Sequence, residues 1–378
     1  MIEKIGKLLV LKSIISNFQS FQMKDTEKVL KEELSKHFEG QSQRLTMMSK
    51  LIIALIKMNT VNYSKLALVL NRTVKVSSNF RRIQRFINEY QFCRQVFIQL
   101  VWSLFASRQA WIVLNIDRTN WKFGKANINI LMIGISYKGT AIPLIWKLLD
   151  KRGNSSKKER IDLLTALQSH LTKDQIDQIH CLVADREFIG NQWIKYLIAQ
   201  PFHFFIRIKK NAKIYKFQNG KACHASRLFT TDQFKVLRKR RYLYGNQLYV
   251  GGQKVNNKEW LILISDVPLK GATQLYGERW GIEVFFGACK TRGFNFEDTH
   301  VTNQNRLCNL IFIIAIAFCW ALKTGEWLIE KGHQIPIKYI KKRKTKLVSM
   351  FRLGLDYLKY RFLNFIASVD DIHVLSCT

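Results

Sequence analysis

The stretch Trp111-Ile-Val-Leu-Asn-Ile-Asp117 is a short apolar run that ends on a carboxylate, and Leu182-Val-Ala-Asp185 repeats the pattern. Both runs have the length and composition of a buried β-strand. Because the ends of strands are where an α/β sheet presents reactive groups, the two aspartates converge if these strands are neighbours. An aspartate after a strand is also a common turn former or helix cap, so each one alone leaves both interpretations open.

The segments around these two runs predict a sheet with helices. From residue 111 the expected order is strand, strand, strand, helix, strand, helix, strand, which indicates a mixed α/β sheet of the ribonuclease-H-like kind. Residues 210–258 contain short β-like runs and read as a β-rich insertion before another strand. The predicted strands are 111–116, 128–136, 141–148, 181–184, 204–208 and 260–264, and the helices are one opening at the capping box Ser156-x-x-Glu159 and one at 191–199.

The pattern also predicts three regions along the chain. Residues 1–100 carry helical spacing and are expected to form a helical N-terminal domain. Residues 105–325 are expected to form the α/β domain, and residues 326–378 a helical, basic C-terminal region. Within the first region, residues 62–70 and 77–87 read as two short helices, the second capped by Ser77 or Ser78.

Three arginines lie on the second of these helices, Arg81, Arg82 and Arg85. Phe80, Ile83 and Ile87 share one face, which directs the arginines largely outward. They either contact DNA or form an ordinary solvated basic face, and the sequence favours neither.

The charge balance narrows the class of partner. The chain has 61 Lys and Arg against 27 Asp and Glu, a formal charge of +34, and such a surplus predicts an anionic partner, first nucleic acid and second an anionic membrane surface. The apolar run 310–322 is shorter than the ~20 residues of a span, so it predicts a buried helix and no membrane partner. No signal peptide is recognisable, so a cytoplasmic protein is expected. Seven scattered cysteines without a Cys-x-x-Cys pair argue against a disulfide framework or a zinc site.

The most specific motif is Tyr276-x2-Arg279-x3-Glu283-x6-Lys290. At about 100° per residue the four side chains fall within an arc of roughly 60° on one helix. A carboxylate can bind a metal ion while Arg and Lys hold flanking phosphates, which suits phosphodiester chemistry.

With this motif the sequence resembles the DDE transposases of bacterial insertion sequences that carry the Tyr-x2-Arg-x3-Glu-x6-Lys signature. Further matching stretches are Asp117-Arg-Thr-Asn-Trp121, Ala184-Asp-Arg186, residues 260–265 and Asn79-Phe-Arg-Arg-Ile-Gln-Arg-Phe86, so the resemblance runs from about residue 45 to 300.

The resemblance implies cut-and-paste DNA transposition, with residues 1–100 as the DNA-binding domain and residues 105–325 as the catalytic domain. Asp117, Asp185 and Glu283 would bind two Mg²⁺ ions, for which Mn²⁺ can substitute, and catalyse cleavage and strand transfer. The partners implied are double-stranded DNA, as terminal inverted repeats and target, and a second subunit in the paired-end complex, with the protein on the bacterial nucleoid when DNA-bound. Trp260 matches a position that stacks on a flipped base, although it also fits a buried strand residue.

Two features depart from this pattern. Glu187 stands where many relatives have Gly, and reads either as an outward surface residue or as a carboxylate that perturbs metal binding. The basic run from Lys338 to Lys346 matches no motif and is either a contact to DNA or a second subunit, or a solvated helix. Three rival functions stay open: a ribonuclease-H-like nuclease without strand transfer, a decayed transposase that only binds DNA, and, more distantly, a membrane-associated basic protein.

Overall fold

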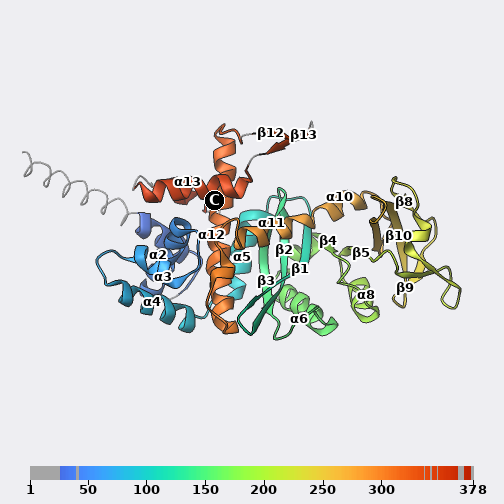
Figure 1. Ribbon diagram of the computed structural model, residues 1–378, viewed down its shortest axis with the longest axis horizontal. Helices are drawn as coiled ribbons and strands as arrows, with labels where there is room; N and C mark the ends of the chain where they lie inside the picture. Colours follow the sequence, from blue (N-terminus) through green and yellow to red (C-terminus); the bar gives the residue numbers. More distant parts are fainter. Residues whose placement is uncertain are drawn as a thin grey trace, which may run out of the picture. The chain divides into compact units, whose positions relative to one another are not determined.

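The computed structural model describes residues 26–39, 42–335, 337–340, 343–346, 348–364 and 370–375. Its contacts divide the chain into two compact units. One comprises Val101–Phe286 and contains the sheet, and the other comprises Met1–Leu100 together with Gly287–Thr378 and is mainly helical (Figure 1). The expected boundary at residue 325 therefore lies inside a helix of the second unit.

The sheet of the first unit has the strand order β3-β2-β1-β4-β5-β11-β10-β9-β6-β7, with β8 paired to β10. Strands β1, β2 and β3 are antiparallel neighbours, whereas β4 lies parallel to both β1 and β5. The mixed α/β sheet expected from the order of elements is confirmed. The strands are β1 (Ile112–Phe123), β2 (Ala126–Tyr137), β3 (Thr140–Leu148), β4 (Ile179–Ala184), β5 (His203–Arg207), β6 (Lys213–Tyr215), β7 (Ala222–His224), β8 (Lys235–Val236), β9 (Arg241–Leu243), β10 (Asn246–Lys254) and β11 (Trp260–Ser265).

Strand β1 is longer than the apolar run that predicted it. It continues past Asp117 because its second half pairs with β2, from Asp117 opposite Met132 to Phe123 opposite Ala126. The prediction that the strand ends before Asp117 was therefore wrong, although its parallel pairing with β4 does end at Ile116.

The β-rich insertion extends the same sheet. The segment of β10 from Tyr249 to Lys254 pairs with β11, and β10 also pairs with β8 and β9. Beyond β9, the order continues with β6 and β7. Gly251 and Gly252 allow this packing, since a Cβ at either position would come within 2.9 Å of the rings of Phe234 or Phe229. The insertion is thus an outer part of the main sheet.

Helices pack onto this sheet from the connections between strands. The capping box of Ser156 and Glu159 is present at the start of α6, as predicted. Helix α10 packs on β4 and β5, where Ala272 and Tyr276 join a core cluster with Val183 and Phe205. The helices of this unit are the π-helix η1 (Trp102–Ala106), α6 (Lys157–Gln168), α7 (Lys173–Asp177), α8 (Asn191–Ile198), α9 (Ala225–Leu228), α10 (Ala272–Gly277) and α11 (Trp280–Cys289), whose last residues belong to the second unit.

The second unit is built around one long helix, α12. The predicted buried segment 310–322 lies within it, and it packs against α2, α4 and α13. Gly354 lets α13 approach closely, because a Cβ there would lie 1.8 Å from the Ala321 oxygen. The elements are a helical segment at 26–35, α2 (Ser42–Met58), α3 (Tyr63–Leu70), α4 (Val76–Glu89), α5 (Arg94–Val101, which ends in the first unit), the 3₁₀ turn η2 (Phe296–Asp298), α12 (Gln304–Glu330), β12 (Ile337–Ile340), β13 (Arg343–Lys346), α13 (Met350–Leu363) and α14 (Asp370–His373).

Helix α12 is long and apolar enough to cross a membrane by length and composition alone. In its most apolar stretch 83% of the residues are buried inside the protein, as in the core helix of a folded unit. The basic run from Lys338 to Lys346 is not the solvated helix considered above, because β12 and β13 pair as antiparallel strands there. Residues 341 and 342 of this run lie outside the described residues.

Helix α4 begins one residue earlier than predicted. Its first residue is Val76, the N-cap is Lys75, and no side chain caps it, so the prediction of a Ser77 or Ser78 cap was wrong. The preceding helix α3 is capped by Asn62, whose side-chain oxygen accepts from the amides of Ser64 and Lys65. Asn79 links the two helices, since its amide donates to the carbonyl oxygens of Ala67 and Asn71.

Candidate active site

The two aspartates lie side by side at the end of the parallel strand pair. Ile116 is in register with Ala184, and the parallel pairing of β1 with β4 ends at these two residues. Asp117 and Asp185 are therefore the first residues beyond the paired segment on each side. The condition on which their convergence was predicted, that the two strands are neighbours, is thus met.

The residues of the Tyr-Arg-Glu-Lys motif come from two helices, not from the single helix that was predicted. Helix α10 ends at Gly277 and α11 begins at Trp280, with Arg279 in the tight turn between them. Helix α11 packs closely against the start of β3: a Cβ at Gly281 would lie 2.6 Å from the backbone carbon of Thr140.

Arg279 connects two of the carboxylates. Its Nη1 atom donates to Oδ2 of Asp117 at 3.2 Å, and its Nη2 donates to Oε1 of Glu283 at 2.5 Å. The Arg279 side chain is only 10% exposed, against 15% for Asp117 and 37% for Glu283. The Tyr276 hydroxyl lies 3.5 Å from Oδ1 of Asp185. Tyr276, Arg279 and the three acids therefore form one cluster.

Burial dominates the electrostatics of Asp117. It raises the pKa of this carboxyl to about 7, and the negative charges of Glu187 and Asp185 act in the same direction. The Arg118 amide, which donates to Oδ1 at 2.7 Å, and the Arg279 guanidinium lower the pKa but do not offset burial. Burial likewise raises the pKa of Tyr276 to about 12, which keeps the phenol protonated as a donor. A perturbed carboxyl in such a cluster is typical of a functional site.

Glu187 is not the outward surface residue considered from the sequence. Its carboxylate forms a two-point ion pair with Arg118, with Nε to Oε1 at 3.3 Å and Nη2 to Oε2 at 3.2 Å. The side chains of Arg118 and Glu187 are 11% and 20% exposed. Arg160, itself buried, donates to the Glu187 carbonyl oxygen at 2.9 Å. Both arginines thus fix the loop that follows Asp185.

Arg207 is a site residue that the sequence interpretation missed. Ala184 is in register with Ile206, so Arg207 follows on β5 in the same row as Asp117 and Asp185. Its guanidinium donates to Glu259 and to the Trp260 carbonyl oxygen, both at 2.8 Å. A charged residue inside the otherwise apolar run Phe204-Phe-Ile-Arg-Ile208 was the available signal.

Two other predicted residues, Lys290 and Trp260, have polar partners outside the three acids. Lys290 belongs to the second unit, where its Nζ is 2.8 Å from Oε1 of Glu297. Trp260 is partly exposed at the start of β11; its Nε1 donates to the Phe229 oxygen at 2.9 Å. The ammonium groups of Lys210 and Lys254 lie 5.1 and 5.9 Å from the Trp260 ring. Trp260 is therefore not the fully buried strand residue of the alternative interpretation.

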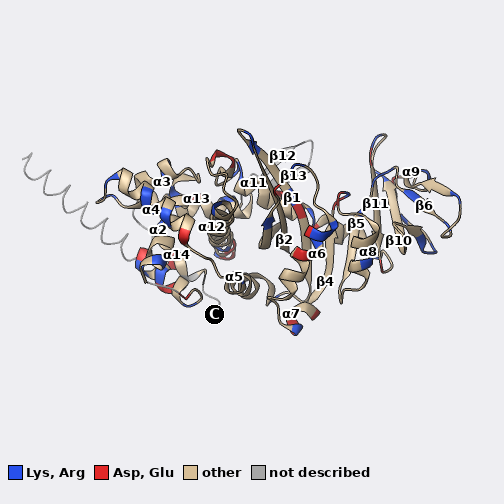
Figure 2. Ribbon diagram, turned by 90° about the horizontal axis from the view of Figure 1, so that it is seen from below, with Lys and Arg blue, Asp and Glu red and all other residues tan. Residues whose placement is uncertain are grey.

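The three arginines of α4 are all exposed, as predicted, while Ile83 and Ile87 are buried. Figure 2 shows the Lys and Arg positions along α4 and along the strands of the insertion.

The three acids suit a divalent metal in their chemistry, because Mg²⁺ prefers oxygen ligands. Within the described part of the chain, no three His, Cys, Asp or Glu side chains gather closely enough to hold a metal ion. The positive charge beside Asp117 and Glu283 is instead the Arg279 guanidinium.

Comparison with known proteins identifies the family. The family described as transposase DDE domain matches residues 113–320, which is more than half of the chain and includes all three acids. The protein therefore belongs to the DDE transposase family, whose members generally use divalent metal ions.

A search of curated proteins gives no match. Among solved structures, a piggyBac transposase synaptic complex with hairpin DNA is similar to this chain with a TM-score of 0.43 and 10% identity. The similarity covers 86% of this chain and 73% of that one.

Proposed function

We propose that this protein is a cut-and-paste transposase that binds the terminal inverted repeats of an insertion sequence and catalyses metal-dependent DNA cleavage and strand transfer. The observation that carries the proposal is the register of Asp117 and Asp185 at the end of β1 and β4, with Glu283 joined to Asp117 through Arg279. We further propose that the sheet is of the ribonuclease-H-like kind, since three antiparallel strands are followed by two parallel ones.

Each residue of the cluster has a distinct task in this proposal. Asp117, Asp185 and Glu283 would hold two Mg²⁺ ions, which supply activation of the attacking hydroxyl and stabilisation of the leaving oxygen when bound. Arg279 exchanges its carboxylate partners for a DNA phosphate, to which a guanidinium can donate two parallel hydrogen bonds. Tyr276, kept protonated by burial, donates a hydrogen bond without adding charge.

Other parts of the chain would bind DNA. The exposed arginines Arg81, Arg82 and Arg85 of α4 contact the terminal repeat, and Lys290 holds a phosphate near the cut. Trp260 stacks on a base extruded near the cleaved end. The protein acts as a homodimer on paired ends, in the bacterial cytoplasm, with DNA neutralising its large positive charge.

A paired-end assay tests the proposal against its nearest rival. DNA carrying the inverted repeats that flank the gene is incubated with protein, Mg²⁺ and a target plasmid. Joined products support transposition, whereas cut ends without joined products support a nuclease that lacks strand transfer. Specific binding without any cleavage supports a decayed transposase.

A further inference from the structure

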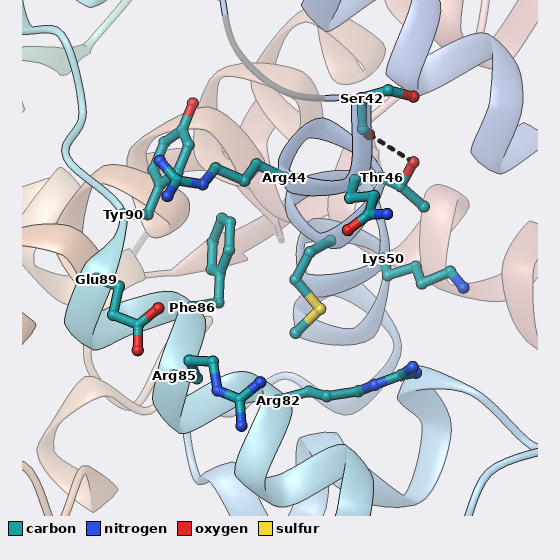
Figure 3. Close-up of a pocket in the computed structure, with 11 residues that line it drawn as sticks. Ser42, Arg44, Thr46, Lys50, Arg82, Arg85, Phe86, Glu89 and Tyr90 are labelled. Carbon is teal, nitrogen blue, oxygen red and sulfur yellow. Dashed lines mark hydrogen bonds between the residues drawn. The ribbon is translucent and has the colours of Figure 1, made fainter.

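A groove lies between α2 and α4 in the helical unit. Its cavity volume is about 600 Å³, and it is lined by Ser42, Gln43, Arg44, Thr46, Met47 and Lys50 of α2 and by Arg82, Arg85, Phe86, Glu89 and Tyr90 at α4 (Figure 3). The rings of Phe86 and Tyr90 are stacked, with centroids 5.0 Å apart, and both side chains are more than nine-tenths buried. The groove thus has a fixed aromatic wall.

Four cationic side chains surround this groove: Arg44, Lys50, Arg82 and Arg85. Arg82 and Arg85 form no ion pair with any described residue, and the Arg44 guanidinium lies 5.9 Å from the Tyr90 ring centroid. Among the described residues, Lys50 alone of the four has an acidic partner, Glu27 at 3.5 Å. The groove therefore concentrates positive charge that the described part of the protein leaves largely unneutralised.

On helix α4, the residues that line the groove differ from the residue that points farthest from the buried stripe. The buried stripe is Asn79, Ile83, Phe86 and Ile87. At about 100° per residue, Arg81 points almost opposite that stripe, Arg85 lies about 40° round the helix from Arg81, and Arg82 about 60° further. Arg82 and Arg85 line the groove that faces α2, and Arg81 does not (Figure 3).

We propose that the groove between α2 and α4 seats the sugar-phosphate backbone of duplex DNA, while Arg81 faces the base edges. The inference rests on the proposed function and adds Arg44, Lys50 and Glu89 to it. Guanidinium groups bind phosphates with two parallel hydrogen bonds, and phosphate contacts fix the register of a protein on DNA without reading sequence. Glu89, the one acid in the lining, opposes this binding by repulsion.

The test measures binding of the full-length protein in EDTA, by fluorescence anisotropy over a series of salt concentrations. The two probes are a duplex with the terminal repeat and a scrambled duplex of equal length. Arg44→Gln and Arg85→Gln should each weaken both duplexes equally. Each should make the slope of log affinity against log salt shallower by about 0.9, the value for one phosphate. Arg81→Gln should instead lower the ratio of specific to scrambled affinity.

Glu89→Gln provides a gain-of-affinity arm, since it should tighten binding of both duplexes. Glu32→Gln is its matched control, because it removes the same charge from an exposed residue of the same unit that does not line the groove. Unchanged melting temperatures exclude unfolding as the cause of any loss.

The proposal is overturned if Arg44→Gln and Arg85→Gln keep the wild-type slope, or if Glu89→Gln binds no more tightly than Glu32→Gln. Either result, with cleavage by the wild type intact, shows that the groove does not bind the DNA backbone and leaves the proposed function unaffected. Absence of DNA binding by the wild type at low salt would remove both. If the groove binds inorganic phosphate while Arg44→Gln and Arg85→Gln leave the salt slope of DNA binding unchanged, the groove is a site for a free anion. That result also contradicts the proposal.

Discussion

Arg118 and Glu187 are joined by two hydrogen bonds, at 3.3 and 3.2 Å, across the ends of β1 and the loop after β4. Arg118 is adjacent to Asp117, and Glu187 is two residues from Asp185; both aspartates are candidate metal ligands. Arg118 also donates to Asn129 and Asn154, so its whole guanidinium is bound. The pair therefore ties the loop after β4 to β1, next to the two aspartates.

Glu187→Ala should destabilise the protein by about 3 kcal/mol, because it leaves a largely buried guanidinium without its carboxylate. Denaturant unfolding measures this cost. Asp162→Ala is the control, since its pair with Lys147 is roughly half exposed in both side chains and should contribute at most about 1 kcal/mol. Equal costs for the two variants would show that the Arg118–Glu187 pair does not stabilise the site.

Arg279→Gln should tighten divalent metal binding to the DNA-free protein, because a metal ion must displace the guanidinium from Asp117 and Glu283. A hydrogen bond between charged groups contributes about 1.5–3 kcal/mol, and about 1.4 kcal/mol corresponds to tenfold in affinity. We therefore expect a gain of about tenfold in Mn²⁺ affinity, read by electron paramagnetic resonance. Arg186→Gln, at an exposed neighbour of Asp185, is the control. Weaker Mn²⁺ binding by Arg279→Gln would contradict the competition.

Metal binding should depend on pH near neutrality. Above a pKa of about 7, Asp117 is ionised and free to bind a cation; below it, the cation must displace a proton. The apparent Mg²⁺ affinity should therefore fall by about fivefold from pH 7 to pH 6, with proton release detected by calorimetry in buffers of different ionisation enthalpy. An affinity that is flat from pH 5 to pH 8 would indicate an Asp117 with an ordinary pKa.

Trp260→Ala should slow hairpin formation more than first-strand nicking, by about tenfold, because stacking on an aromatic ring contributes about 1–3 kcal/mol per base. Trp260→Phe should retain most of the activity. Trp111→Ala removes an indole that is 61% exposed at another place in the unit and should change neither step. Equal loss of nicking and hairpinning with a lowered melting temperature would make Trp260 a structural residue.

The strands and their order could be predicted because short apolar runs, such as the one that precedes Asp185, are typical of buried strands. Pairing partners are not visible in such runs, so neither the continuation of β1 beyond Asp117 along β2 nor the row that brings Arg207 to the aspartates could be predicted. The spacing of the motif predicted that residues 276–290 form one helix. The break at Arg279 lies next to Gly281, which packs against Thr140 at the start of β3, and spacing along the chain does not report such a long-range contact.

The most direct test of the central claim is single-turnover cleavage of the flanking terminal-repeat DNA by Asp117→Ala, Asp185→Ala and Glu283→Ala, with equilibrium binding of the same DNA measured in parallel. Asp162→Ala, which removes an exposed carboxylate from the same unit, is the control. Metal ligation and backbone contact are separate tasks, so each of the three site variants should lose cleavage while binding the DNA nearly as tightly as the wild type. Cleavage at the wild-type rate by any one of them would remove that residue from the active site and contradict the account.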